Sequence, residues 1–191
     1  MLAEARRIFL KIGYQATTLD DVAAAAGFTK GAVYWHFPNK RALFLALVAE
    51  SVESNLGTLE AFLASPAAKP SELKEKLGEW IDGLDERESL PAFGAELEIE
   101  SRRDAEVRTI HQRMIVEHEA KLAAFLQRYF EAVGEEPALP PIELSRALIT
   151  VFKGFALSRQ NRPVDPPTSA MVVRHLLGLP LVPNDRIDGQ A

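Results

Sequence analysis

The residues with the most specific chemistry in this chain lie between positions 18 and 40. They combine hydroxyl, ammonium, imidazole and aromatic side chains with two small residues: Thr18, Thr29, Lys30, Gly31, Ala32, Tyr34, Trp35, His36 and Lys40. Such side chains donate to phosphates and base edges, and an indole can contact a thymine methyl group. Small residues at Gly31 and Ala32 let a helix backbone approach the bases closely. The pattern is compatible with binding of double-stranded DNA through Lys30, Tyr34, Trp35, His36 and Lys40, although an aromatic cluster of this kind also fits a hydrophobic core.

The other polar patterns favour neither catalysis nor metal binding. Glu96, Glu98 and Glu100 are spaced by two, so on a helix they diverge and form no general acid–base pair. His111 and His118 are about 10 Å apart along a helix, too far to share one ion at about 2 Å without further ligands. The chain has no cysteine, and no Gly-rich phosphate loop or nucleophile elbow is found. We therefore expect no enzyme activity, no metal and no cofactor.

The charge of the chain is unevenly distributed. The formal net charge is −5 over 191 residues, which by itself argues against a partner that is a polyanion. Residues 1–50, however, carry six Lys and Arg against four Asp and Glu, whereas the remainder carries 16 basic and 23 acidic residues. Residues 1–50 therefore carry a net charge of +2, and the remainder carries −7. This asymmetry is expected of a DNA-reading domain attached to an acidic domain.

Helices must position the candidate contacts, because apolar residues recur at helical spacing and no strand pattern of period two is convincing. Gly, Pro and capping residues divide the chain into about nine predicted helices, at roughly 2–12, 18–26, 30–35, 40–64, 70–84, 91–101, 104–133, 141–160 and 167–179. Asn39 is the candidate N-cap of the fourth. The predicted fold class is all-α, with an N-terminal three-helix domain followed by a larger helical domain.

The second and third helices read as a helix-turn-helix. Thr18 can cap the second helix, with Asp21 completing a capping-box arrangement. Gly27 supplies the backbone freedom of the turn, and Thr29 can cap the third helix. The wedge between the two helices is filled by small or branched residues, Val22, Ala23 and Val33.

The segment from Thr17 to Leu43, TTLDDVAAAAGFTKGAVYWHFPNKRAL, resembles the signature of TetR-family regulators, and residues 5–14 are similar to that family's first helix. The stretch TKGAVYWHF most resembles the AcrR-type multidrug-efflux repressor branch. The resemblance implies a homodimer with one helix-turn-helix per subunit on a near-palindromic operator. It places Thr29, Lys30, Ala32 and Trp35 near base edges and Thr18, Tyr34, His36 and Lys40 at phosphates. Family members usually carry a basic arm before the first helix, whereas this sequence starts almost inside that helix.

The same resemblance divides the chain into a helix-turn-helix domain (1–45), an effector-binding and dimerisation domain (46–180) and a flexible tail (181–191). Candidate effector contacts are large, soft or polar side chains: Trp80, Phe93, His111, Met114, His118, Phe125 and Phe152. An ordinary core role is the alternative at each of these positions. Likewise, the apolar stripes of 141–160 and 167–179 fit either a dimer interface or intramolecular core.

These features predict a cytoplasmic transcriptional repressor that small, largely apolar molecules release from DNA. No apolar run approaches the roughly 20 residues of a membrane span, and the start does not read as a signal peptide, so no membrane partner is expected. Two alternatives remain open. One is a DNA-binding regulator without a small-molecule effector, such as an activator or a partner-controlled protein, and the other is a helical ligand carrier with a vestigial helix-turn-helix.

Overall fold

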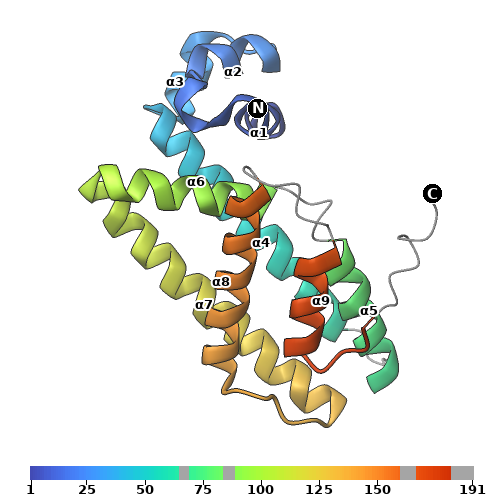
Figure 1. Ribbon diagram of the computed structural model, residues 1–191. Coiled ribbons are helices and arrows are strands. Elements are labelled where there is room, and N and C mark those ends of the chain that lie inside the picture. Colours follow the sequence, from blue (N-terminus) through green and yellow to red (C-terminus); the bar gives the residue numbers. More distant parts are fainter. Residues whose placement is uncertain (65–68, 84–88, 160–166, 182–191) are drawn as a thin grey trace, which may run out of the picture. The chain divides into compact units, whose positions relative to one another are not determined.

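The computed structural model describes residues 1–64, 69–83, 89–159 and 167–181, and every regular element in these ranges is a helix (Figure 1). The elements are α1 (Leu2–Ala16), α2 (Leu19–Ala26), α3 (Lys30–His36), α4 (Lys40–Leu63), α5 (Pro70–Asp82), α6 (Ser89–Arg103), α7 (Ala105–Val133), α8 (Pro141–Arg159) and α9 (Pro167–Leu176). The all-α prediction is therefore confirmed.

Most helix ends lie within two or three residues of the predicted ones, and the first helix shows the instructive difference. Gly13 was expected to end it, but the helical path resumes and α1 continues to Ala16. Gly13 has φ 78° and ψ 171°, so it forms a kink inside the element. A residue with a Cβ rarely adopts this φ, which explains the glycine. The predicted break at 65–66 and the tail beyond residue 181 lie outside the described residues.

The chain packs as two compact units. The first consists of Met1–Asn55 together with Ser89–Met114, and the second of Leu56–Glu88 together with Ile115–Ala191. Both α4 and α7 therefore contribute to each unit. The predicted functional division at residue 45 stays a prediction, since packing divides the chain at other positions.

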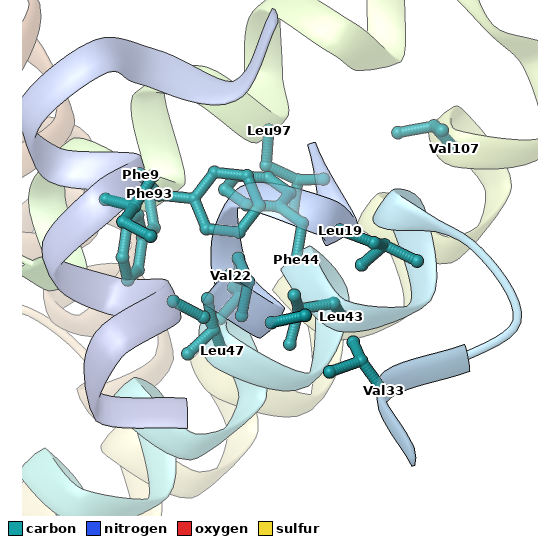
Figure 2. Close-up of a cluster of buried hydrophobic side chains, with 14 residues drawn as sticks. Phe9, Leu19, Val22, Val33, Leu43, Phe44, Leu47, Phe93, Leu97 and Val107 are labelled. Carbon is teal, nitrogen blue, oxygen red and sulfur yellow. The ribbon is translucent and has the colours of Figure 1, made fainter. Parts of the chain in front are cut away.

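The core of the first unit is built by helices from two separate stretches of sequence (Figure 2). Its fully buried members from the N-terminal segment include Val22, Val33 and Leu43, each with no exposed surface. Phe93 and Leu97 of α6 and Val107 of α7 complete it: Ala5, Ile8, Phe9, Leu19, Val22, Ala23, Val33, Leu43, Phe44, Leu47, Val48, Phe93, Leu97 and Val107. The rings of Phe44 and Phe93 meet edge to face with centroids 5.7 Å apart. The helix-turn-helix thus shares one hydrophobic core with α6.

The second unit has its own core, to which α5, α7, α8 and α9 contribute buried side chains: Leu73, Leu77, Ile81, Phe125, Leu126, Tyr129, Phe130, Leu144, Leu148, Val173 and Leu177. Arg174 of α9 is buried and donates to both carboxylate oxygens of Asp82 at the end of α5. Its guanidinium also donates to the carbonyl of Pro180 at 2.8 Å. This bidentate contact ties α9 to α5 within the unit.

Helix α4 corrects one prediction. By length and composition it is apolar enough to cross a membrane, although no such run was expected. Its apolar side chains have partners in the fold, however. Leu43, Phe44 and Leu47 are buried in the first unit, and Leu56 and Leu59 are buried in the second. The apolar character of α4 is therefore that of a core helix.

Candidate nucleic-acid interface

The N-terminus of α2 is closed by the predicted capping box. The Thr18 hydroxyl accepts from the Asp21 N–H at 3.1 Å, and the Asp21 carboxylate accepts from the Thr18 N–H at 3.0 Å. The same hydroxyl donates to that carboxylate at 2.6 Å. These hydrogen bonds hold the pKa of Asp21 below its ordinary value. The arrangement satisfies N–H groups that a helix start leaves unpaired, and it keeps the exposed Thr18 side chain in one orientation.

The turn between α2 and α3 depends on Gly27, which has φ 68° in the left-handed region. The N–H groups of Gly27 and Phe28 donate back to carbonyls of the last turn of α2, with Phe28 N 3.0 Å from Ala23 O. Val22 and Val33 are fully buried where the two helices cross. The predicted turn residue and wedge residues are confirmed in these positions.

The third helix is short, capped and largely exposed. The Thr29 hydroxyl accepts from the Ala32 N–H at 3.2 Å, as predicted for the cap. Trp35 is 80% exposed and Tyr34 is 49% exposed, high values for aromatic side chains. The remaining candidates on this helix, Lys30, Gly31 and His36, are exposed, whereas Ala32 is partly buried. The first turn of α3 therefore has small side chains at Gly31 and Ala32. The larger side chains of Tyr34 and Trp35 follow one turn later.

Lys40 begins α4 and is partly buried, because it contacts the end of α1. Its Nζ donates to the carbonyls of Tyr14 at 2.8 Å and Gln15 at 2.9 Å, and it lies 4.5 Å from the centre of the Tyr14 ring. Asn39 caps this helix, as its side-chain oxygen accepts from the Ala42 N–H at 2.9 Å. The lysine predicted to bind phosphate therefore has intramolecular partners at the end of α1, and its contact with DNA stays a prediction.

The kink at Gly13 creates polar contacts that sequence reasoning missed. Beyond the kink, the Tyr14 N–H donates to Glu96 of α6 at 3.1 Å, and the Gln15 side chain donates to Glu100 at 2.6 Å. The Thr17 hydroxyl donates to the Gly13 carbonyl at 2.7 Å. Burial, with nearby carboxylates, raises the pKa of Tyr14 above its ordinary value. Glu96 and Glu100, which are four residues apart and share one face of α6, thus accept hydrogen bonds from the segment that leads into α2.

A second polar contact joins α4 to the start of α7. Arg41 forms ion pairs with Asp104 and Glu106. Asp104 also accepts from the N–H groups of Glu106 at 2.8 Å and Val107 at 3.1 Å, so it caps α7. The hydrogen bond from Val107 is the main cause that lowers the pKa of Asp104. Arg41, which follows Lys40 in the sequence, therefore has its ion-pair partners within the first unit.

The seven candidate effector contacts do not lie in one unit. Phe93, His111 and Met114 belong to the first unit, where Phe93 is a core residue and Met114 packs against the same core. His111 is buried, with its Nδ1 4.0 Å from Glu98. The other four belong to the second unit: Trp80, His118, Phe125 and Phe152. Phe125 is fully buried there beside Tyr129, with ring centroids 6.1 Å apart. Their common role in binding an effector stays a prediction.

Within the described ranges, no three His, Asp or Glu side chains gather in a way that could hold a metal ion. The two histidines considered from the sequence belong to different units.

The crossing of α2 and α3 and the exposed face of α3 define a helix-turn-helix protein whose other described elements are also helices. Residues 1–47 match the family model for bacterial regulatory proteins of the tetR family. The regulator AcrR of Shigella flexneri is 47% identical over 60 residues, which are 31% of this chain and 27% of that protein. The curated relatives that the chain matches are thus aligned over about a quarter of their length.

Two solved structures resemble nearly the whole chain. GusR of Salmonella enterica has a TM-score of 0.64 at 22% identity, covering 93% of each chain. The complex of SmeT with triclosan has a TM-score of 0.64 at 24% identity, covering 92% of this chain and 87% of that one. These likenesses show the fold. The N-terminal segment is thus similar to the tetR-family model over residues 1–47, and the chain as a whole has the fold of these structures.

Proposed function

We propose that this protein is a transcriptional repressor that binds a near-palindromic DNA operator as a homodimer and that a small, largely apolar molecule releases it. The observation that carries the proposal is the form of α3, which we propose as the recognition helix. It is capped at Thr29, has small residues in its first turn, and exposes Tyr34 and Trp35. A helix of this kind suits the major groove, where its N-terminal residues reach base edges.

The proposed contacts are divided by their chemistry. Lys30 and Trp35 are assigned to bases, since an ammonium can donate to guanine O6 and N7 and an indole can contact the thymine methyl group. Thr18 and Lys40 are assigned to phosphates. To donate to a phosphate, the Thr18 hydroxyl must turn its O–H away from the Asp21 carboxylate, while its oxygen can keep accepting from the Asp21 N–H.

Effector release is proposed by analogy of fold. SmeT, which shares this fold, has been solved in complex with triclosan. A ligand that binds better to a conformation unsuited to the operator shifts the population away from DNA, and ligand and operator then weaken each other by the same factor. The second unit has an apolar, aromatic core around Phe125, and the proposal assigns the effector to this unit.

Dimerisation and location complete the proposal. A homodimer would present two recognition helices to successive major grooves, which matches a two-fold symmetric site. Exposed apolar side chains at Ile142 of α8 and Met171 of α9 are compatible with a partner surface on these helices. We expect the protein to act in the cytoplasm, where its DNA partner is found.

The first test is selection of bound duplexes from a random pool, with the full chain at near-physiological salt. A two-fold symmetric site with half-sites about one helical turn apart is the expected result. Weak binding without sequence preference would refute the repressor assignment and favour the ligand carrier with a vestigial helix-turn-helix. If the site is recovered, it becomes the probe for an effector screen. An affinity that no bound ligand changes would favour a regulator without an effector.

A further inference from the structure

The charge of the recognition helix is paired before any DNA is present. Lys30, the first residue of α3, places its Nζ 2.6 Å from Oδ2 of Asp20 in the first turn of α2. The pair connects the two helices of the helix-turn-helix across their turn. The hydrogen bond and the charge of Asp20 raise the pKa of Lys30 above its ordinary value, so the ammonium is protonated in the pair.

The carboxylate of Asp20 has a definite orientation. Its other oxygen, Oδ1, is buried and has no hydrogen-bond partner among the described residues. A buried oxygen without a donor is costly, so the pairing of Oδ2 with Lys30 is the compensating contact. The side chain of Lys30 is 70% exposed and that of Asp20 is 45% exposed, so both groups are accessible from solvent.

Pairing changes what Lys30 offers to DNA. Affinity that does not depend on sequence comes from ammonium and guanidinium groups that neutralise phosphates and release counterions. An ion pair carries no net charge, and a lysine held by Asp20 therefore contributes little to that term. An ammonium has three donors, however, and Asp20 uses one of them. The remaining N–H groups can still donate to a guanine O6 or N7.

We infer that Asp20 is a specificity-determining residue: it holds the Lys30 ammonium for hydrogen bonding to a base edge and suppresses its contribution to sequence-independent phosphate binding. The inference rests on the proposed function, because it requires that α3 reads DNA. It assigns to Asp20 a positioning role through Lys30 and no direct contact with a base.

The test compares Asp20→Asn with Glu4→Gln in the full chain. Both substitutions remove one negative charge from an exposed ion pair in the first unit, since Glu4 accepts from Arg7 at 2.8 Å on α1. Affinity is measured for a duplex selected by the wild-type protein and for a random duplex of equal length, over a series of salt concentrations.

For Asp20→Asn we expect tighter binding to the random duplex, by roughly five- to tenfold per bound subunit near 0.1 M salt. The slope of log K against log salt should steepen by about 0.9 per subunit, and the ratio of specific to random affinity should fall. Glu4→Gln should change neither. In a Lys30→Gln background, Asp20→Asn should lose its effect on the slope.

An unchanged slope and specificity ratio in Asp20→Asn would overturn the inference, as would an equal change in Glu4→Gln, which would mean that net charge alone matters. Equal weakening for both duplexes would assign Asp20 a purely structural role and would also overturn it. Failure of the wild-type protein to select any duplex is a different outcome, because it refutes the proposed function before Asp20 is tested.

Discussion

Removal of the Glu96 side chain tests whether α6 holds the segment that leads into the helix-turn-helix. The Tyr14 N–H follows the kink at Gly13 and donates to Glu96 at 3.1 Å. A hydrogen bond to a charged group contributes about 1.5–3 kcal/mol. Because this contact is only partly buried, we expect Glu96→Ala to lose about 1–2 kcal/mol of the free energy that holds the segment closed.

Hydrogen exchange of the Tyr14 amide reports directly on its hydrogen bond to Glu96. A loss of about 1–2 kcal/mol corresponds to roughly 5- to 30-fold faster amide hydrogen exchange at Tyr14, since a factor of ten corresponds to about 1.4 kcal/mol. Glu96→Gln keeps an acceptor oxygen and should lose less protection. Operator affinity should fall several-fold in Glu96→Ala, because the segment Gly13–Thr17 directly precedes the proposed phosphate contact Thr18.

A control variant separates this effect from a general change in helix stability. Glu131→Ala removes an exposed carboxylate of α7 that accepts from the Gln127 side chain, so it should leave Tyr14 exchange unchanged. Equal exchange at Tyr14 in Glu96→Ala and the wild type would refute the reasoning, as would equal acceleration in Glu131→Ala.

Three further predictions follow from other contacts. Gly27→Ala should destabilise the protein by about 1–2 kcal/mol, because φ is 68° there; a midpoint in urea equal to that of the wild type would contradict this. Lys40→Ala should weaken DNA binding and lower the log–log salt slope by about 1 per subunit, whereas weaker binding with an unchanged slope would leave Lys40 only its contacts with α1. Burial raises the pKa of Tyr129 to about 12, so its neutral form stabilises the fold fully below pH 10, and this contribution is lost as the pH rises through about 12. Absorbance titration should show a phenolate forming near pH 12 that Tyr129→Phe removes; identical titrations of the two proteins would contradict the burial.

Interactions between residues close in sequence explain why the helix-turn-helix segment could be predicted in detail. Thr18, Gly27, Thr29 and Asn39 each act on backbone groups within a few residues of themselves, so their residue types and spacing are sufficient to identify them. The prediction of an all-helical chain succeeded for the same reason, since helical spacing is itself a local pattern.

Contacts between distant segments explain what was missed. Nothing near Phe93 in the sequence indicates that its ring meets Phe44, so a core role could be given only as the alternative to an effector contact. Glu96 shows only its spacing from neighbouring glutamates, while its partner lies 82 residues earlier in the chain. A useful signal was nevertheless present at Gly13, because a kink frees an N–H group that must find an acceptor elsewhere.

The shared core of the first unit limits how this protein can be dissected. The family match ends at residue 47, yet Phe93, Leu97 and Val107 are members of the core that contains Phe9 and Phe44. A fragment ending there would expose the apolar faces that α6 and the start of α7 cover. The first unit is therefore discontinuous in sequence, so exchange of the helix-turn-helix segment with that of another protein of this fold requires the transfer of residues 89–114 along with the N-terminal segment.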